Sequence, residues 1–327
     1  MILVTGGCGF IGSNLVAALE ATGERVVVSD WLENGDKWRN IAKRDLEDII
    51  RPEDLPVFLE ANKKQISIIY HMGAISATTE TDGDAVLKNN FRLSKDLWLW
   101  SAENYVRFIY ASSGATYGDG GAGFDDNDSP EHLAKLRPLN LYGWSKHQFD
   151  RWVVAQRTAL KKPLQCAGLK FFNVYGPNEY HKGNMRSVVH QIHPVAQRGE
   201  SFSLFKSHHP SYPDGGQLRD FVWVGDAVDI MLWLRQNHGT NGLFNVGSGK
   251  ARSFADLGAA VYHALGREPM LTYRDTPMEL RAKYQYFTEA KMDKLRAAGY
   301  DTSRLTGLED GVRRYVQDYL QQPDPYL

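Results

Sequence analysis

A glycine-rich segment near the start of the chain constrains the fold more than any other feature. The apolar run Ile2-Leu3-Val4 leads directly into Thr5-Gly6-Gly7-Cys8-Gly9-Phe10-Ile11-Gly12, and a helical pattern follows over Ile11–Ala21. Glycines lack a Cβ atom, so they allow a tight turn between strand and helix and let the backbone approach a pyrophosphate. The segment predicts a dinucleotide-binding loop, and the competing interpretation is a glycine-rich turn that binds nothing.

An acidic residue follows the second predicted strand. Asp30 comes directly after the strand Arg25–Ser29, about 20 residues beyond the glycine loop, where a carboxylate usually binds the ribose 2′-hydroxyl of NAD. Lys37 and Arg39 follow closely, and their cations can pair with the 2′-phosphate of NADP or simply face solvent. These residues by themselves leave NAD and NADP undecided.

Strand-like and helical segments alternate through the first half of the chain. Two further apolar runs, Ile66–His71 and Phe108–Ser112, are separated by a helical stretch near Ala85–Glu103. Such alternation predicts an α/β fold with a Rossmann-type, doubly wound parallel sheet. The binding sites of such sheets lie at the carboxyl ends of the strands.

The second half of the chain is less regular and predicts a smaller α/β domain. A strand-like run over Leu169–Val174 leads into Tyr175-Gly176-Pro177, which marks a boundary, and His208–Gln217 is rich in loop-forming residues. The tail Gln321–Leu327 contains two prolines and is expected to fray. We expect residues 1–172 and 219–246 to form the Rossmann domain, and residues 173–218 and 247–327 to form the smaller one.

The charge balance argues against whole classes of partner. The 327 residues contain 38 Lys and Arg against 39 Asp and Glu, and the resulting net charge of −1 gives no global attraction to nucleic acid or acidic membranes. No apolar run approaches the ~18 residues of a membrane-spanning helix, and the first residues resemble a strand rather than a signal peptide. We expect neither nucleic acid nor a membrane as a partner.

Cysteine and histidine usage argues against metal and disulfide chemistry. The two cysteines, Cys8 and Cys166, can form neither a metal cluster by themselves nor a disulfide framework, so the expected location is the reducing cytoplasm. The histidines, among them His181, His190 and His193, match no zinc-ligand spacing. We therefore expect no metal.

Three side chains with complementary chemistry lie near the end of one predicted strand. Tyr142 and Lys146 share one face of a helix, and Ser113 directly follows the strand Phe108–Ser112. A free phenol has a pKa near ~10, but a nearby ammonium and a cationic nicotinamide ring favour the phenolate. Tyr142 can then take a proton from a substrate hydroxyl that Ser113 holds, while Lys146 also binds the nicotinamide ribose. The alternative is an ordinary amphipathic helix face.

Together these motifs resemble the extended short-chain dehydrogenase/reductase superfamily over almost the whole chain. Members of this superfamily act on nucleotide-sugars, so the resemblance implies that the C-terminal portion binds a nucleotide-sugar. Besides the glycine loop and the Tyr142–Lys146 pair, the resemblance rests on Asn89-Asn90, Ala111-Ser112-Ser113-Gly114-Ala115-Thr116-Tyr117-Gly118, Asn173-Val174-Tyr175-Gly176-Pro177 and Arg219-Asp220-Phe221-Val222.

A narrower set of motifs is similar to the ADP-L-glycero-D-manno-heptose 6-epimerase family. This resemblance implies conversion of ADP-D-glycero-D-manno-heptose to its L-glycero epimer, which supplies heptose for the lipopolysaccharide core. It also implies NADP rather than NAD, with Lys37 near Asp30, and a homo-oligomer, which is a pentamer in the family. The motifs are Asn34-Gly35-Asp36-Lys37-Trp38, His71-Met72-Gly73-Ala74-Ile75-Ser76, Thr78-Thr79-Glu80, Gly176-Pro177-Asn178-Glu179-Tyr180-His181-Lys182-Gly183, and Tyr284-Gln285 followed by Phe287-Thr288.

The same resemblance assigns site residues by position. It implies that Ser113, Tyr142 and Lys146 are catalytic and that Lys182 is a second acid/base. Asn184 stands where a serine is usual, and the loop after His208 is longer than is typical. The implied substrate contacts are Ser113, Asn173, Asn184, Gln191, Phe205, Lys206, Ser207, His208, Arg219 and Tyr284. The implied cofactor contacts are Gly6, Gly9, Phe10, Ile11, Gly12, Asp30, Trp31, Lys37, Met72, Gly73, Ala74, Ile75, Ser76, Asn89, Tyr142, Lys146, Val174 and Lys182.

Two acid/base residues suit this chemistry. Inversion through a ketone requires hydride removal from one face and return to the other, and the exocyclic carbon 6 of a heptose can present either face by rotation about one bond. The alcohol oxygen then points to a different side of the pocket, beyond the hydrogen-bond reach of about 3 Å from a single base. Tyr142 and Lys182 can supply the two bases, in an order that the sequence leaves open. Alternatively, Lys182 contacts a phosphate or faces solvent.

Three other functions compete with this interpretation. A hexose 4-epimerase needs a single tyrosine base, and Lys182 would then be dispensable. A 4,6-dehydratase needs an added acid pair beside the serine, where Gly114-Ala115-Thr116 stands instead. A non-catalytic NADP-binding sensor or scaffold usually lacks the tyrosine–lysine pair, and both residues are present here.

Overall fold

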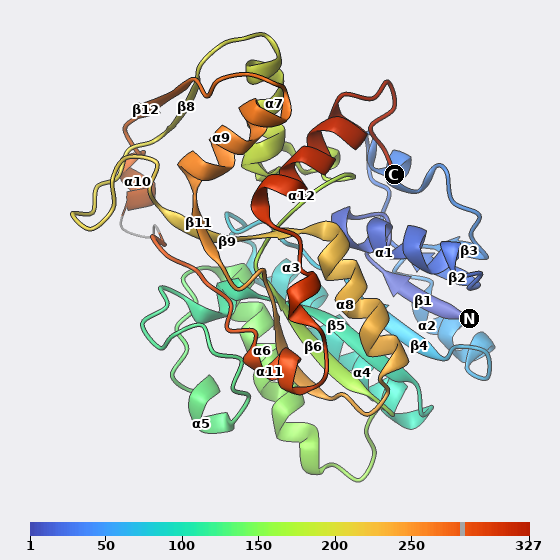
Figure 1. The fold of residues 1–327 in the computed structure, drawn as a ribbon. Helices are drawn as coiled ribbons and strands as arrows, with labels where there is room; N and C mark the ends of the chain where they lie inside the picture. The colour runs from blue at the N-terminus through green and yellow to red at the C-terminus, as the bar shows by residue number, and fades with distance from the viewer. Residues whose placement is uncertain (282–284) are drawn as a thin grey trace.

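The computed structural model describes residues 1–281 and 285–327, and its centre is a parallel seven-stranded sheet (Figure 1). The strand order is β10-β6-β5-β4-β1-β2-β3, and all six pairings are parallel. The winding reverses between β1 and β4, where sheets of this kind open a binding crevice. The strands are β1 (Ile2–Thr5), β2 (Val26–Ser29), β3 (Asp48–Ile50), β4 (Ile68–His71), β5 (Arg107–Ser113), β6 (Cys166–Phe171) and β10 (Gly242–Val246).

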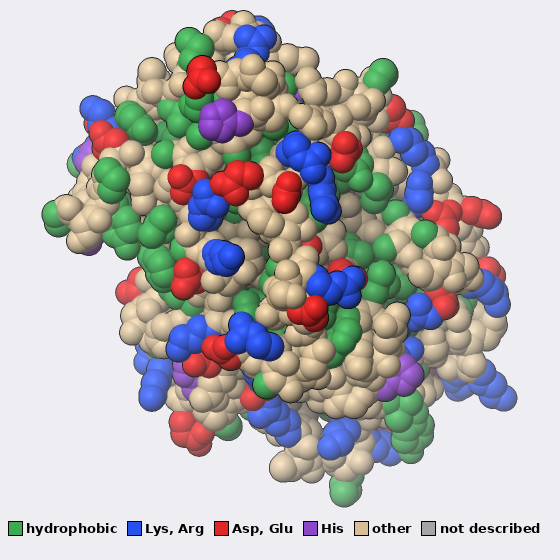
Figure 2. All heavy atoms as spheres, in the orientation of Figure 1, with side chains coloured by type: hydrophobic (Ala, Val, Ile, Leu, Met, Phe, Trp, Pro, Cys, Tyr) green, Lys and Arg blue, Asp and Glu red, His purple; other side chains and the backbone are tan. Residues whose placement is uncertain are grey.

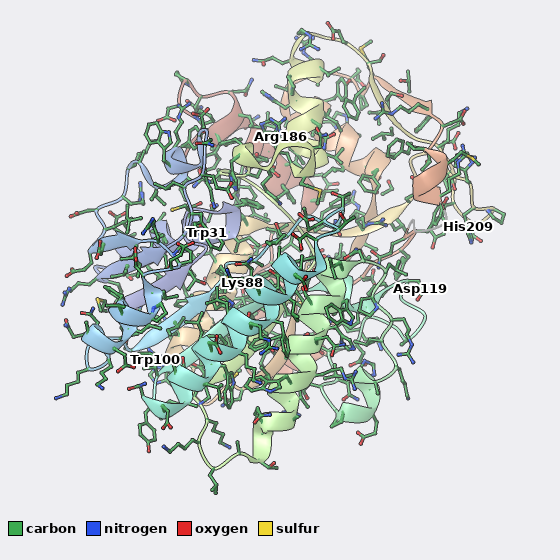
Figure 3. All side chains as sticks on the ribbon, turned by 180° about the vertical axis from the view of Figure 1, so that it is seen from behind. Trp31, Lys88, Trp100, Asp119, Arg186 and His209 are labelled. Carbon is green, nitrogen blue, oxygen red and sulfur yellow. The ribbon has the colours of Figure 1, made fainter. Side chains whose placement is uncertain are left out.

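Helices cover both faces of this sheet, which is why its inner strands are short runs of buried apolar residues. Helices α1 and α8 contact each other on one face (Figure 1), and α4 and α6 cover the other (Figure 3). The Rossmann-type fold predicted from the sequence is confirmed. The helices are α1 (Phe10–Ala21), α2 (Leu55–Asn62), α3 (Gly83–Val86), α4 (Leu93–Glu103), α5 (Pro130–Leu133), α6 (Leu141–Ala155), α7 (Val188–Gln197), α8 (Val224–Gln236), α9 (Phe254–Ala264), α10 (Met278–Arg281), α11 (Asp293–Ala297) and α12 (Leu308–Arg314).

A second apolar core lies beyond the carboxyl ends of the central strands. It joins one face of α7 to α9, α12 and the two small sheets, with Ile192, Val261 and Tyr315 fully buried at its centre. The two-domain division predicted from the sequence remains a prediction. The small sheets have the orders β11-β9-β7 and β12-β8, formed by β7 (Asn173–Tyr175), β8 (Phe202–Phe205), β9 (Leu218–Trp223), β11 (Ala251–Ser253) and β12 (Leu271–Arg274).

The strand predicted over Leu169–Val174 is wrong as a single element. The chain forms two strands there, because Phe172 donates its N–H to Val246 at 3.0 Å and also accepts the N–H of Val174 at 2.9 Å. The resulting bend ends β6 in the large sheet and starts β7 in a small one. Alternating apolar residues continue through the bend, so periodicity alone cannot reveal it.

The expectation that Gln321–Leu327 frays is also wrong. Tyr326 is only 9% exposed, and the carbonyl of Pro325 accepts the hydroxyl of Tyr180 at 2.8 Å. An aromatic side chain that buries most of its surface outweighs the local tendency of a proline-containing terminus to stay loose. The tail ends beside the first segments of the chain (Figure 1).

The surface agrees with the balanced charge. On the face shown in Figure 2, Lys and Arg side chains lie among Asp and Glu side chains rather than in a separate patch. Across the two described ranges, no helix has the length and apolar character needed to cross a membrane.

Buried histidines predict that the fold is sensitive to acid. His71 is fully buried, with its ring nitrogens 2.6 Å from the Thr5 hydroxyl and 2.8 Å from the Ser94 hydroxyl, and burial lowers its pKa to about 3. Burial also lowers the pKa of His147 to about 4. In the unfolded chain these histidines bind a proton near pH 6.5. The contribution of the two neutral histidines to the free energy of unfolding is therefore fully present above that pH, and it is lost as the pH falls towards their folded-state pKa values.

At pH 5, each of these two histidines is expected to cost about 2 kcal/mol of the free energy of unfolding. Urea titrations at pH 7 and pH 5 measure the difference, and His71→Asn should remove part of it. Equal unfolding free energies at the two pH values would contradict the prediction.

Candidate active site

A cleft with a volume of about 1030 Å³ lies at the carboxyl ends of the central strands. It begins at the glycine loop, where backbone segments approach too closely for any side chain. A Cβ atom on Gly12 would lie 2.1 Å from the carbonyl oxygen of Gly6, and one on Gly6 (φ +66°) would lie 2.5 Å from Gly73. The loop therefore packs directly on the segment after β4. It leaves the start of α1 at the cleft without a side-chain cap, which suits a pyrophosphate.

Asp30 lines this cleft directly after β2, and its carboxylate already has partners. It accepts the N–H of Cys8 at 2.9 Å and the N–H of Trp31 at 2.8 Å, and it pairs with the Lys37 ammonium at 2.8 Å. Lys37 therefore neutralises the charge that would repel a 2′-phosphate. Arg39, the other candidate cation, lies instead over the ring of Tyr326, 4.4 Å from its centroid.

A π-helical turn, η2 (Leu87–Arg92), fixes the loop that follows β4. Within it, Asn90 is fully buried and binds Ile75 twice, accepting its N–H at 2.8 Å and donating to its carbonyl at 2.9 Å. The same amide donates to the Ser145 hydroxyl at 3.0 Å, which joins this loop to α6. Asn89, the neighbour predicted to contact the cofactor, lines the cleft. Asn90 is therefore the residue of this pair that holds the wall together.

The start of α6 brings Tyr142 to Ser113. Asn140 caps the helix by accepting the N–H of Gly143 at 2.8 Å, and a Cβ atom on Gly143 would lie 2.7 Å from the carbonyl oxygen of Ala115. This close approach holds the first turn of α6 against the turn that follows β5. Burial raises the pKa of Tyr142, and a hydrogen bond with Ser113 opposes that rise. Formation of the phenolate at neutral pH would therefore need additional positive charge nearby.

Lys146 lies one turn further along α6, and it is only 2% exposed. Burial lowers its pKa to about 8, and the carboxylate of Asp150 opposes this effect. Asp150 is fully buried in the next turn, where it accepts the hydroxyls of Ser112 at 2.7 Å and Tyr110 at 3.0 Å and pairs with Lys170 at 3.0 Å. Sequence reasoning missed Asp150, although its spacing of four residues from Lys146 was visible.

Lys182 reaches the cleft from a separate segment, the 3₁₀ turn η5 (Tyr180–Met185). Its ammonium lies 5.4 Å from the centroid of the Phe10 ring, at the start of α1. Burial lowers the pKa of Lys182, and the Glu179 carboxylate opposes that change. A lysine with a lowered pKa is better able to exchange a proton at neutral pH than an exposed lysine.

All eighteen residues predicted to contact the cofactor line this cleft, as do two of the predicted substrate contacts, Ser113 and Asn173. Arg219 lies nearby on β9, 5.7 Å from the ring of Phe254, which itself lines the cleft. Tyr284 lies outside the described residues. The other predicted substrate contacts are not among the lining residues, and all these roles remain predictions. These residues are Asn184 and Gln191, which are both exposed, Phe205 at the end of β8, and Lys206, Ser207 and His208 directly after it.

Arg186 is a lining residue that sequence reasoning missed. It lies between η5 and α7, and its guanidinium donates to the carbonyl of Gly183 at 2.7 Å. Figure 3 labels it together with Trp31, which also lines the cleft. The available signal was its position four residues after Lys182, in the segment that also carries Asn184.

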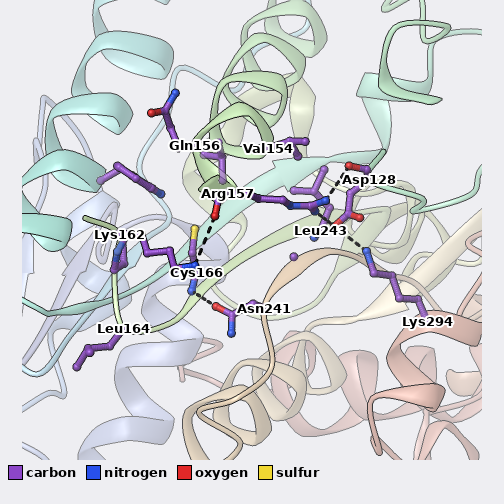
Figure 4. Close-up of a pocket in the computed structure, with 14 residues that line it drawn as sticks. Asp128, Val154, Gln156, Arg157, Lys162, Leu164, Cys166, Asn241, Leu243 and Lys294 are labelled. Atoms are coloured by element: carbon purple, nitrogen blue, oxygen red, sulfur yellow. Dashed lines mark hydrogen bonds and ion pairs between the residues drawn. The ribbon is translucent and has the colours of Figure 1, made fainter. Parts of the chain in front are cut away.

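A second cavity, of about 520 Å³, lies at the amino ends of β6 and β10 (Figure 4). Three of its charged groups are already paired, because Asp128 binds both Arg157 and Lys294. Burial raises the pKa of the Cys166 thiol in its wall to about 12, so this thiol is unreactive at neutral pH. Active sites of parallel sheets lie at the opposite, carboxyl ends, so the larger cleft is the candidate active site. Within the described residues, no cluster of His, Cys, Asp or Glu side chains is arranged to bind a metal ion.

Comparisons with known proteins agree with this geometry. The model of the NAD dependent epimerase/dehydratase family matches residues 2–247. The chain is 50% identical to ADP-L-glycero-D-manno-heptose-6-epimerase of Nitratidesulfovibrio vulgaris strain DP4, and 47% identical to the protein of that name from Fusobacterium nucleatum, each over 100% of both chains.

Two solved structures show the same fold. The first is ADP-L-glycero-D-manno-heptose-6-epimerase of Helicobacter pylori, with 27% identity, a TM-score of 0.77, and 97% of this chain and 95% of that chain covered. The second is the NAD complex of Thermus thermophilus UDP-glucose 4-epimerase, with 25% identity, a TM-score of 0.74, and 96% and 97% covered. The similarity therefore covers both the central seven-stranded sheet and the region of the two small sheets.

Proposed function

We propose that this chain, which belongs to the NAD dependent epimerase/dehydratase family, inverts carbon 6 of the heptose in ADP-D-glycero-D-manno-heptose. The observation that carries the proposal is 50% identity, over the full length of both chains, to a relative named for this activity. The product, ADP-L-glycero-D-manno-heptose, supplies the heptose of the lipopolysaccharide core. The chain is accordingly an isomerase that acts on a nucleotide-sugar.

The cleft fits a nicotinamide dinucleotide. The glycine loop forms a cradle that a Cβ atom would fill, and the start of α1 has no acidic residue in its first turn. Gly9 and Gly12 would hold the pyrophosphate, Asp30 and Lys37 the adenosine ribose, and Lys146 the nicotinamide ribose. When bound, the dinucleotide accepts a hydride from carbon 6 of the heptose and returns it to the resulting ketone.

The chain's own residues move the proton. In one half of the reaction, Tyr142 or Lys182 takes the proton of the carbon-6 hydroxyl as a ketone forms, and Ser113 holds the oxygen. The substrate then turns about the bond to carbon 6, and the other residue delivers a proton to the same oxygen. Each turnover exchanges the protonation states of the two residues, so both must re-equilibrate with solvent. Desolvation at the cleft wall raises the pKa of Tyr142 and lowers that of Lys182. This brings the pKa of Lys182 closer to neutral pH and leaves Tyr142 protonated until positive charge is added.

The cofactor we propose is NADP. Its 2′-phosphate would meet the Lys37 ammonium, which neutralises the buried Asp30 carboxylate at 2.8 Å. Without Lys37, the unpaired carboxylate would repel that phosphate and would suit the 2′-hydroxyl of NAD instead.

Lys37→Met is therefore expected to weaken NADP binding about 100-fold while changing NAD binding much less. Fluorescence titration of the protein stripped of dinucleotide measures both dissociation constants. Lys63→Met, which removes an exposed cation paired with Glu60, is the matched control. If NADP binding by Lys37→Met equals that of the unmodified chain, NADP selection through Lys37 is wrong.

Proton NMR tests the reaction itself. The purified protein should convert ADP-D-glycero-D-manno-heptose to the L-glycero epimer without added cofactor, because the dinucleotide is regenerated in each turnover. Acid release followed by mass measurement identifies the bound dinucleotide. Turnover of UDP-glucose to UDP-galactose instead would favour the 4-epimerase alternative and overturn the proposal.

The assembly and location are also proposals. We propose a homo-oligomer, a pentamer as in the resembled family, which light scattering of the purified protein can measure. We propose a cytoplasmic location, which the two unpaired cysteines support because reducing compartments keep thiols free.

A further inference from the structure

The end of the chain packs against the segment that carries Lys37. We call residues 323–327 the tail segment. The carboxylate of Asp324 and the carbonyl of Tyr326 both bind the Lys43 ammonium, at 3.0 and 2.7 Å. The Tyr326 ring lies under the guanidinium of Arg39, 4.4 Å from its centroid. The tail segment therefore contacts η1 (Lys37–Ile41) and the residues just after it.

The same few residues also pack against the segment that carries Lys182. The Tyr180 hydroxyl donates to the carbonyl of Pro325 at 2.8 Å, and the Tyr180 and Tyr326 rings meet edge to face at 4.9 Å. The N–H of Leu327 donates to the side-chain oxygen of Asn178 at 3.0 Å. Tyr326 thus lies between Arg39 on one side and Tyr180 on the other.

Asn178 connects these contacts to the glycine loop. It is fully buried in a left-handed conformation (φ +71°), which asparagine adopts more readily than other non-glycine residues. Its side-chain nitrogen donates to the Ser13 hydroxyl at 3.0 Å and to the Asn40 carbonyl at 3.2 Å. Asn40 in turn binds the carbonyl of Cys8 at 2.8 Å and the His181 ring at 3.1 Å.

We propose that the tail segment is a positioning element that holds the Lys182 turn and the Lys37 turn against the glycine loop. This inference rests on the proposed function, because it concerns the second acid/base of that reaction. Lys182 lies only two residues beyond Tyr180, and η5 is a short 3₁₀ turn, which by itself is a weak support. The contacts of the tail segment add to the restraint that the Asn40–His181 contact gives this turn.

The effect on catalysis follows from the geometry of proton transfer. A proton moves only when donor and acceptor lie within hydrogen-bond reach, and a displacement of about 1 Å can cost 100-fold in rate. Without the tail segment, Lys182 samples a larger volume, whereas Tyr142 on α6 keeps its position. The step that depends on Lys182 therefore slows selectively.

Two variants test the proposal. One chain ends at Pro323 and lacks the rest of the tail segment, and the other is the full chain with Tyr326→Ala. The matched control is Tyr105→Ala, which removes an exposed tyrosine that precedes β5 at the opposite end of the sheet. Each bound-dinucleotide form is mixed with either ADP-heptose epimer, and the absorbance of the reduced nicotinamide follows each half-reaction separately.

We expect both tail variants to slow the half-reaction of one epimer by about 10- to 100-fold and to spare the other. The affected epimer should be the same one that Lys182→Met affects. If the tail segment only stabilised the fold, its loss would slow the half-reactions of both epimers equally. Equal slowing, or unchanged rates of both half-reactions, would overturn the proposal.

Hydrogen exchange provides a readout that needs no substrate. In the variants, backbone amides of residues 37–41 and 180–185 should exchange at least about tenfold faster, while those of β4 and β5 keep their protection. Unchanged exchange in both turns would overturn the positioning role even if the chain had a different substrate. Failure of the unmodified chain to convert either epimer would instead refute the proposed function, so the two failures are distinguishable.

Discussion

Tyr142→Phe is expected to lower the rate of epimerisation at least about 1000-fold, because general acid–base catalysis contributes up to about four orders of magnitude. Phenylalanine keeps the ring that is packed at the start of α6, so the change removes only the hydroxyl that hydrogen-bonds with Ser113. The cleft and its dinucleotide contacts should stay intact. Proton NMR of the heptose C6 signals gives the rate, and mass measurement of released dinucleotide confirms the occupancy.

The control for this prediction is another tyrosine that loses a hydrogen bond. Tyr300 donates its hydroxyl to Asp229 at 2.9 Å, and neither residue lines the cleft. Tyr300→Phe should therefore keep the activity of the unmodified chain. A Tyr142→Phe variant that epimerises at more than about a tenth of the unmodified rate would contradict the assignment of Tyr142 as an acid/base.

Lys182→Met is the second variant with a large expected effect, again on the order of 1000-fold on epimerisation. Methionine is similar in length to lysine, and its polarisable thioether can contact the Phe10 ring in place of the ammonium. The substitution therefore removes the proton-binding amine while filling most of the same space. In the two-base reaction, one epimer can still be oxidised with Tyr142 as base. We therefore expect one half-reaction to survive and the other to disappear.

Two further variants separate proton transfer from charge. Lys182→Arg keeps the cation but cannot lose its proton at working pH, so it should fail like the methionine variant if Lys182 is an acid/base. It should keep activity if Lys182 only binds a phosphate. Lys161→Met, which removes an exposed cation paired with Glu103, is the control for loss of charge. A fully active Lys182→Met variant would leave a single-base mechanism as the better account.

The geometry of the glycine loop and of the start of α6 could be predicted because its signals are local. A Cβ atom on Gly12 would collide with the carbonyl oxygen of Gly6, only six residues earlier, and the strand before the loop and the helix after it are adjacent to it in the chain. The four-residue spacing of Tyr142 and Lys146 likewise fixes a shared helix face. Short-range geometry of this kind is determined by the order of residue types.

The supporting residues could not be predicted, because their partners are far away in the chain. Asp150 matters through Lys170 and Tyr110, which lie on two different strands. Asn178 matters through Ser13 and Asn40 in the first turns of the molecule. No periodicity or spacing reports which distant segments come within hydrogen-bond distance.

By itself, the sequence determined the fold class, the glycine loop between β1 and α1, and the chemical character of the proposed catalytic residues, since backbone sterics and helix geometry act over a few residues. Only the tertiary structure decided which groups are buried, and burial is what lowers the pKa of Lys146 to about 8 and lowers that of Lys182. It also decided that a proline-containing tail is ordered rather than frayed, because Tyr326 gains contacts with Arg39 and Tyr180 that the tail cannot provide for itself. Desolvation and packing depend on everything that surrounds a side chain, and that environment exists only once the chain has folded.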